Sequence, residues 1–309
     1  MKLVKKYKEI RGKLKDKNAF EQQLFSITTI IESKVRIDGM LYFSQGSGFY
    51  YTEQSLIEEG TATKKWHRLD KFWLVTNRHV VVLKIDGKEY LPDSFTFCFR
   101  ENVNGEIRWK PILLSRDELF SILKLHKNSN VDVAVLDISQ FVINIINEHS
   151  QLKEKPGLYL PSSLSNRNLP ENQALMVDVT SDIIVASYPK GFYDKWNKFP
   201  IVKSGIIASG WELEFNGKPM FQIDAQLFPG SSGGLVISKP TNIAFFDETV
   251  HYSKYKQFVF LGIYSGEYTW HEKIKIDGKE IEMERSYGLG NVWYSYLVPQ
   301  IISGGVKFN

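Results

Sequence analysis

A short glycine-rich turn constrains the fold of this chain more than any other feature of its sequence. Pro229-Gly230-Ser231-Ser232-Gly233-Gly234 lies between two apolar runs, Phe221–Leu227 and Leu235–Ile237. Glycine accepts positive φ angles and lets other atoms approach the backbone closely. The stretch therefore predicts a tight turn between strands that presents a serine hydroxyl beside several backbone amides. A nucleophile next to an oxyanion hole has this layout, although a hairpin that only reverses the chain has the same composition.

The composition is that of an ordinary globular protein. The chain has 309 residues, of which 43% are hydrophobic and 24% charged, enough for one large domain or two small ones. Its 15 tyrosines, 20 phenylalanines and 7 tryptophans favour β structure. The net charge of +4 is too small to indicate nucleic-acid binding by itself. The single cysteine, Cys98, lies in an apolar run, so we expect a buried thiol and a reducing compartment.

The N-terminus is the only segment with a strong charge bias. Residues 1–19 are rich in lysine, and Leu3, Tyr7, Ile10 and Leu14 recur at helical spacing, which predicts a basic amphipathic helix. Such a helix could contact a membrane or a nucleic acid, but we favour docking of its narrow apolar stripe on the body of the protein. No apolar signal region follows it and no run is long enough to span a membrane, so we expect a cytoplasmic protein.

Beyond Asn18, short apolar or alternating runs separated by turns predict an all-β barrel or sandwich. We divide the chain into a first β half over 20–139, a linker over 140–170 and a second β half over 171–309. Two short helices are expected, at Asp117–Lys127 and Gln140–Leu152. The strands expected in the second half are Met176–Thr180, Ile183–Ser187, Ile201–Ser209, Met220–Leu227, Leu235–Ile237, Phe258–Ser265 and Gly290–Tyr296.

Two further residues complete a candidate catalytic set with Ser232. His79 follows the predicted strand Trp73–Thr76, where an imidazole is both anchored and accessible. Asp132 begins the apolar run Asp132–Leu136, where it either ends a loop or accepts the Nδ1–H of an imidazole. The order histidine, aspartate, serine is that of the two-barrel serine proteases.

Several motifs resemble those of HtrA-like proteases and other bacterial trypsin-like peptidases. Thr76-Asn77-Arg78-His79-Val80-Val81 is similar to their histidine motif, and Asp132-Val133-Ala134-Val135-Leu136 to their aspartate motif. Gln222-Ile223-Asp224-Ala225 followed by Pro229–Gly234 resembles their serine motif. Two weaker resemblances are found at Gly46–Phe49 and Ser204–Ala208. A third, formed by Tyr188–Phe192 together with Phe199–Val202, is similar to a cytoplasmic bacterial branch of these peptidases. Together the matches extend from about residue 46 to 266.

The resemblance implies two antiparallel β-barrels of the chymotrypsin type and a serine endopeptidase that acts on proteins or peptides. Ser232 would attack the scissile carbonyl, His79 would take its proton, and Asp132 would hold the imidazole. The backbone N–H groups of Gly230 and Ser232 would form the oxyanion hole.

The resemblance also implies a substrate-binding strand and a specificity pocket. The residues expected there are Gln226, Leu227, Ser265, Gly266, Glu267 and Gly288. Gln226 takes the position at the pocket base where a trypsin-like enzyme has an acid, so we expect an uncharged side chain before the scissile bond. Glu267, at the rim, either attracts a cation or is simply solvated.

Some features depart from the resembled family. Ser231 stands where digestive members have an aspartate that pairs with a newly cut N-terminus, so activation by cleavage is not expected. Only Leu297–Asn309 follows the last predicted strand, so we expect no PDZ domain.

One cysteine and scattered histidines predict no metal or cofactor site. A catalytically silent protease fold used as a binding or scaffold module is the alternative function.

Overall fold

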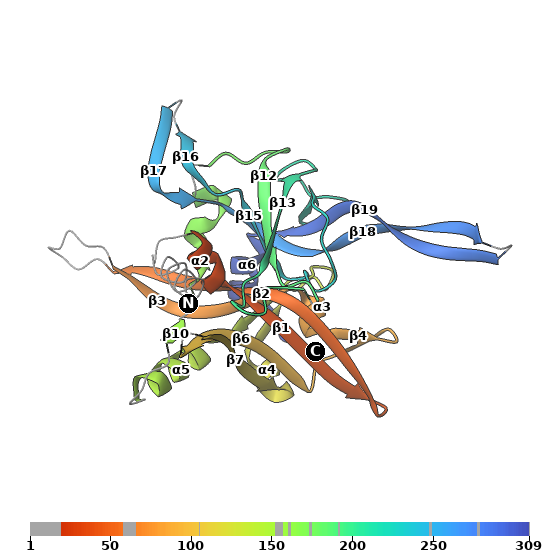
Figure 1. Ribbon diagram of the computed structural model, residues 1–309, viewed down its shortest axis with the longest axis horizontal. Helices are drawn as coiled ribbons and strands as arrows, with labels where there is room; N and C mark the ends of the chain where they lie inside the picture. The colour runs from red at the N-terminus through yellow and green to blue at the C-terminus, as the bar shows by residue number, and fades with distance from the viewer. Residues whose placement is uncertain are drawn as a thin grey trace, which may run out of the picture.

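Strands make up most of the chain, in two groups that follow one another in the sequence (Figure 1). The computed structural model describes residues 20–57, 66–104, 106–151, 157–159, 162–172, 175–190, 192–246, 249–276 and 279–308. The basic helix expected over residues 1–19 lies outside these ranges. The expected all-β fold with two β halves and a few inserted helices is confirmed.

The first half is a nine-stranded sheet. Its strands are β1 (Thr28–Ile37), β2 (Met40–Ile57), β3 (Trp66–Thr76), β6 (Ser94–Val103), β7 (Glu106–Ser115), β8 (Leu123–Leu125), β9 (Ala134–Asp137), β10 (Gly157–Tyr159) and β11 (Leu164–Ser165). The order is β10-β6-β1-β2-β3-β9-β8, with β7 beside β6 and β11 beside β2. In β1, Ile31, Ser33 and Val35 are buried while Lys34 and Arg36 are exposed, because successive side chains of a strand point to opposite faces.

The second half is a closed barrel of six antiparallel strands. They are β12 (Asp182–Ser187), β13 (Ile201–Ile207), β14 (Met220–Asp224), β15 (Gly234–Ser238), β18 (Phe260–Ile276) and β19 (Lys279–Tyr294). The barrel closes in the order β12-β13-β14-β19-β18-β15. The glycine-rich turn that contains Ser232 joins β14 to β15, so two barrel strands position it.

Several hairpins extend from this framework. β4 (Leu83–Ile85) pairs with β5 (Lys88–Tyr90), and β16 (Thr241–Phe246) pairs with β17 (Thr249–Gln257). The longest extension is the outer part of β18 and β19, which projects far from the barrel as a two-stranded arm (Figure 1). We call Tyr268–Tyr287 the arm.

Helices are short and lie between or after the strands. They are α2 (Phe20–Ile27), α3 (Arg78–Val81), α4 (Arg116–Ile122), α5 (Ser139–Gln151), α6 (Leu297–Gly304) and two 3-10 turns at Asn166–Asn168 and Pro170–Asn172. The helix α4 starts with a capping box, in which Ser115 Oγ accepts from Glu118 N at 3.3 Å and Glu118 Oε2 accepts from Ser115 N at 2.8 Å. The helix expected at Gln140–Leu152 is present as α5, whereas the one expected at Asp117–Lys127 ends at Ile122 as α4, and Leu123–Leu125 form the strand β8.

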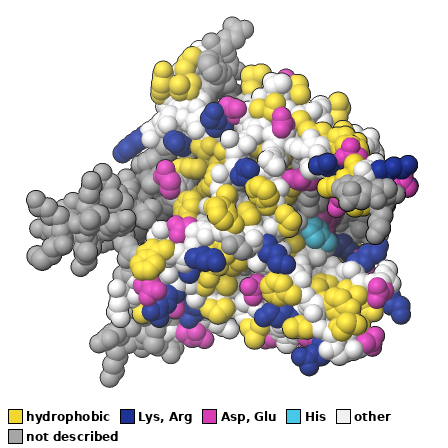
Figure 2. Space-filling view, turned by 45° about the vertical axis from the view of Figure 1, so that its right-hand side comes forward, with side chains coloured by type: hydrophobic (Ala, Val, Ile, Leu, Met, Phe, Trp, Pro, Cys, Tyr) yellow, Lys and Arg dark blue, Asp and Glu magenta, His cyan; other side chains and the backbone are white. Residues whose placement is uncertain are grey.

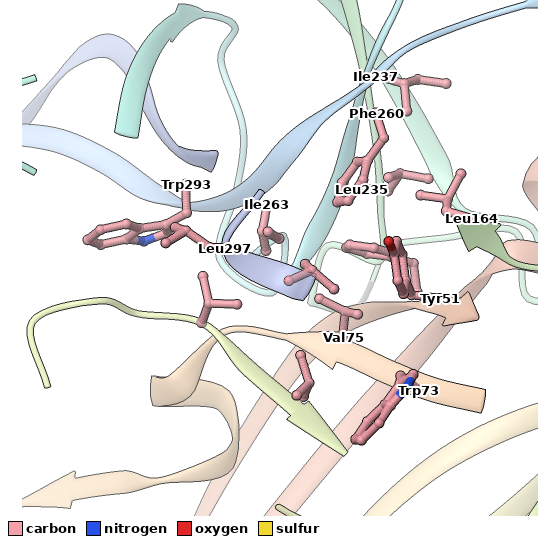
Figure 3. Packing of buried hydrophobic residues seen from close by; sticks show 14 of the residues in the cluster. Tyr51, Trp73, Val75, Leu164, Leu235, Ile237, Phe260, Ile263, Trp293 and Leu297 are labelled. Carbon is pink, nitrogen blue, oxygen red and sulfur yellow. The ribbon is translucent and has the colours of Figure 1, made fainter. Parts of the chain in front are cut away.

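One hydrophobic core joins the two halves. Figure 3 shows Tyr51, Trp73 and Val75 from the first sheet packed with Leu235 and Phe260 from the barrel, and these side chains belong to one buried cluster. The rings of Phe49 and Phe260 meet edge to face across the boundary, with their centroids 5.3 Å apart.

The structure revises two expectations about the boundaries. The segment 140–170 is more than a linker, because β10 and β11 pair with β6 and β2 of the first sheet. The last segment does not end in the second barrel: Leu125 N donates to Val306 O and Lys124 Nζ donates to Ile302 O, so α6 and the residues after it lie against the first half.

The expected strand Met176–Thr180 is absent. This segment is an exposed turn in which Ser181 N donates to Asp178 O at 3.0 Å and Asp178 N donates to Ser181 Oγ at 2.9 Å. Met176 is 88% exposed, and of the apolar residues that suggested a strand only Val177 packs against the core of the barrel.

On the face turned forward in Figure 2, basic and acidic side chains are interspersed among hydrophobic ones. No helix of the described residues is both long enough and apolar enough to cross a membrane.

Candidate active site

His79 lies on the helical turn α3, which follows β3 after Asn77. Val80 and Val81 are buried and anchor this turn, which leaves the imidazole 48% exposed. Its Nδ1 lies 2.7 Å from Asp132 Oδ2, and its backbone N donates to Asp132 Oδ1 at 2.9 Å. The carboxylate therefore holds both the ring and the backbone of the histidine.

Asp132 precedes β9, which is paired with β3, and this pairing brings the aspartate to His79. Its backbone carbonyl accepts from Asn77 Nδ2 at 2.7 Å, and its Oδ2 accepts a further bond from Ser265 Oγ at 2.8 Å. These contacts fix the carboxylate in one orientation beside the imidazole.

The environment of His79 favours its charged form. Desolvation of the half-exposed ring by the surrounding protein disfavours the imidazolium, but the hydrogen bond to Asp132 and the negative charge of that carboxylate outweigh this effect, so the pKa of His79 is raised above its usual value. A ring with this pKa, hydrogen-bonded at Nδ1, has the properties of a general base and acid.

Ser232 lies on the predicted tight turn. Gly230 and Gly233 have φ angles of +92° and +81°, and a Cβ on Gly233 would come within 2.0 Å of Ser47 O, so neither position accepts another residue without strain. Ser232 Oγ donates to Ser265 O at 3.2 Å. Ser231 is fully buried, where its hydroxyl accepts from Ser187 Oγ at 3.1 Å.

Two side chains tie the serine turn to the histidine and the aspartate. Asn77 donates to the Asp132 carbonyl and accepts from Gly233 N at 2.5 Å. Ser265 accepts from Ser232 through its carbonyl and donates to Asp132 through its hydroxyl. The structure thus brings Ser232, His79 and Asp132 into one hydrogen-bonded network at the boundary of the two halves. The sequence marked Asn77 only as part of a motif and gave no signal for the Ser265 hydroxyl.

Two amides on the turn are open to a ligand. Within the described residues, the N–H groups of Gly230 and Ser232 donate no hydrogen bond. The amides of Ser231, Gly233 and Gly234 all donate within the protein. Adjacent unpaired donors on a rigid turn can bind a developing oxyanion.

A pocket of about 400 Å³ opens beside Ser232. Its lining residues come from the serine turn and from the start and the arm of the β18–β19 pair: Leu227, Phe228, Pro229, Ser232, Tyr264, Gly266, Glu267, Thr269, Glu284 and Ser286. Three of the residues expected at the substrate site are among them, namely Leu227, Gly266 and Glu267. Ser265 and Gly288 are not part of this lining.

The lining of this pocket includes two acidic side chains, whereas the sequence predicted a neutral pocket with Gln226 at its base. Gln226 is exposed and does not line the pocket. Glu267 does, and its Oε1 accepts from Leu227 N at 3.0 Å. Glu284 reaches the same pocket from the arm, and neither lysine nor arginine is among the lining residues. The sequence missed Glu284 because only the folded arm brings it near the serine turn.

Among the residues that the structure describes, no group of three or more histidine, cysteine or acidic side chains could hold a metal ion. The chemistry available at this site is that of a serine, an imidazole and a carboxylate.

An all-β fold of two halves, with a serine turn beside a histidine–aspartate pair at their boundary, defines the class of trypsin-like peptidases. The family model described as the trypsin-like peptidase domain matches residues 46–242, more than half of the chain. The chain therefore belongs to the trypsin-like peptidase family. No curated protein matches it.

Proposed function

We propose that the chain is a serine endopeptidase that hydrolyses peptide bonds of proteins through Ser232, His79 and Asp132. The observation that carries the proposal is the network at the boundary of the halves. Asp132 orients His79 through two hydrogen bonds, and Asn77 and Ser265 connect this pair to the turn of Ser232. An HtrA-like type of enzyme and a cytoplasmic setting are finer parts of the proposal, which rest on the motifs and on the single cysteine.

The proposed reaction begins with a movement of the Ser232 hydroxyl. In the free protein this hydroxyl donates to Ser265 O. A substrate strand that pairs with the backbone at Ser265 competes for that carbonyl, and the hydroxyl then turns to His79 Nε2. Such pairing is β-augmentation, in which main-chain bonds contribute affinity and side-chain pockets contribute specificity.

The chemical steps follow from the roles of the three side chains. Ser232 Oγ attacks the carbonyl carbon while His79 accepts its proton, and the N–H groups of Gly230 and Ser232 stabilise the oxyanion. The imidazolium, held by Asp132, then protonates the leaving amine as the acyl-enzyme forms. Water attacks the acyl-enzyme in the reverse sense, with His79 again as the base.

Labelling with a fluorophosphonate tests this function most directly. The wild-type protein should gain one adduct by intact mass, and Ser232→Ala should gain none. On a peptide substrate, Ser232→Ala should lower kcat by about 10⁶. Ser231→Ala is the matched control, because its hydroxyl is buried against Ser187 and faces no substrate.

The alternative is a silent binding module with the same fold. It predicts that the wild-type protein does not react with the fluorophosphonate although it is folded. Equal labelling of wild type and Ser232→Ala would assign the reaction to another residue and would remove Ser232 from the mechanism.

A further inference from the structure

The direction of the Gly230 N–H depends on the peptide that joins Pro229 to Gly230. The residue before Ser232 is Ser231, which is fully buried and carries no charge that could form an ion pair to fix this turn. Other contacts must therefore hold the turn in the state that offers the Gly230 N–H to a substrate.

One such contact is made by the backbone of Lys190. Its N–H donates to Pro229 O at 2.8 Å. In a trans peptide the C=O and the following N–H point in opposite directions, so this bond turns the Gly230 N–H away from Lys190. A flipped peptide would lose the bond. A Cβ on Gly230 would lie 2.5 Å from Lys190 N, so only glycine allows this approach.

A second contact is made by the hydroxyl of Ser47, which is 1% exposed. It donates to Gly230 O at 2.9 Å and accepts from Tyr188 N at 2.8 Å. The two successive carbonyls of Pro229 and Gly230 are thus both held, one by Lys190 and one by Ser47. Both contacts depend on where Tyr188 lies.

Tyr188 is fixed by Arg100, a buried cation from β6 of the first sheet. The guanidinium donates to the Tyr188 hydroxyl, to Thr28 O at 2.9 Å and to Lys198 O at 2.8 Å. It lies between two aromatic rings, with distances of 4.2 Å to the centroid of Phe25 and 4.6 Å to that of Trp109. Within the described residues, no carboxylate pairs with it.

A buried cation is a poor source of net stability, because apolar side chains in its place are often as good or better. Arg100 instead fixes an orientation, because the rigid, planar guanidinium with its five N–H donors holds Tyr188 in one position at the boundary of the two halves. The chain of contacts then runs from Arg100 through Tyr188 and Ser47 to the Gly230 carbonyl.

We propose that Arg100, Tyr188 and Ser47 are positioning residues that hold the Gly230 carbonyl and, together with the Lys190 N–H on the Pro229 carbonyl, keep the Gly230 N–H directed at the oxyanion. This inference rests on the proposed peptidase function. It assigns the support of the oxyanion hole to contacts between the two halves.

The test compares Tyr188→Phe and Ser47→Ala with Tyr50→Phe. Tyr50 is a matched control, since it is also buried and its hydroxyl donates to Cys98 O at 3.0 Å without contacting the serine turn. For each protein, kcat and KM on a peptide substrate, the inhibition constant of a peptide aldehyde and the Tm are measured. The aldehyde forms a tetrahedral adduct whose oxygen occupies the oxyanion hole.

Ser47→Ala should lower kcat by about 10² to 10³, the effect of losing one oxyanion donor, with KM nearly unchanged. The aldehyde should bind more weakly by a similar factor. Tyr188→Phe should lower kcat by at least about tenfold, because the hydroxyl loses its contacts with Arg100, Thr28 and Lys198 and acts on the turn only indirectly. Tyr50→Phe should lower Tm to a similar extent as Tyr188→Phe but should leave kcat and aldehyde binding unchanged.

The inference is overturned if Tyr188→Phe and Ser47→Ala keep the wild-type kcat, or if they change KM alone. It is also overturned if Tyr50→Phe lowers kcat as much as Tyr188→Phe, because the loss of kcat would then result from a less stable protein and not from a displaced oxyanion hole. In each of these cases the wild-type protein still cleaves the peptide and reacts with the fluorophosphonate. A wild-type protein that does neither would refute the proposed function itself.

Discussion

At the scale of single residues, we expect the His79–Asp132 pair to determine how the proposed peptidase activity depends on pH. The pKa of His79 is raised by Asp132 in spite of burial, and only the neutral ring can accept the serine proton. Activity should therefore fall on the acid side with a midpoint above about 6.5, the ordinary value for histidine. In Asp132→Asn this midpoint should move to lower pH, because the effect of burial remains and the charge is lost. The measurement is kcat/KM against pH for both proteins.

The same substitution should lower kcat by about 10⁴, because an amide favours the wrong tautomer of the imidazole. The fold should persist, since Asn can still accept from the His79 backbone N–H. A variant with near-native turnover and an unchanged acid limb would remove Asp132 from the mechanism. A near-UV circular dichroism spectrum like that of the wild type is the control for folding.

A second prediction at this scale concerns substrate choice. Glu267 and Glu284 line the pocket beside Ser232 without a cation among the lining residues, so a lysine or arginine side chain before the scissile bond should be preferred. A hydrogen bond to a charged group contributes about 1.5 to 3 kcal/mol, so Glu267→Gln or Glu284→Gln should reduce this preference roughly tenfold or more. A peptide library varied at that residue measures it. Dominance of aliphatic residues in the wild-type protein would contradict the assignment of an acidic pocket.

The residues around the serine also show what sequence patterns can and cannot predict. The turn at Ser232 and the position of His79 were recognisable because local motifs encode local backbone geometry. Gln226 was assigned to the pocket by spacing alone, yet spacing does not determine which way a side chain of an irregular segment points. Glu284 and Ser47 reach the serine turn through segments far from it in the chain, and no local pattern carries that information.

At the scale of elements, the arm is the part of the fold that the sequence predicted least. The expected strands ended near Ser265 and began near Gly290, whereas β18 and β19 extend to Ile276 and from Lys279. Both faces of the arm are accessible to solvent, so its residues do not show the alternation of a half-buried strand. Local pairs hold it together, such as the 2.9 Å ion pair between Arg285 and Glu272.

Shortening the arm should change selectivity without affecting the chemistry. Thr269 and Ser286 face each other in the register, so Trp270–Arg285 can be replaced by an Asn-Gly turn. This removes Glu284 from the pocket and should reduce the preference for basic side chains, with an unchanged rate of fluorophosphonate labelling. The matched control shortens only the tip at the paired residues Ile274 and Ile281 and keeps Glu284. Equal selectivity of both variants would show that the arm plays no part in the pocket.

At the scale of the whole molecule, the shared core predicts that the two halves unfold together. Phe260 is fully buried in a cluster that includes Phe49 and Trp73 of the first sheet. Phe260→Ala should lower the free energy of unfolding by about 3 to 5 kcal/mol, and Phe260→Leu by less. Denaturant transitions followed by tryptophan fluorescence and by fluorophosphonate labelling should coincide in each variant. Two separate transitions would mean that each half is stable alone.

The only cysteine of the chain lies within this common structure. Cys98 is 7% exposed on β6, and burial together with the nearby charge of Glu32 raises the pKa of its thiol to about 12. At neutral pH the reactive thiolate is therefore scarce, and iodoacetamide should leave activity intact. The thiol can react only when the first sheet opens, so its rate of alkylation measures how often that opening occurs. Alkylation of Cys98, two residues from Arg100, therefore reports how often the first sheet opens locally in the native protein.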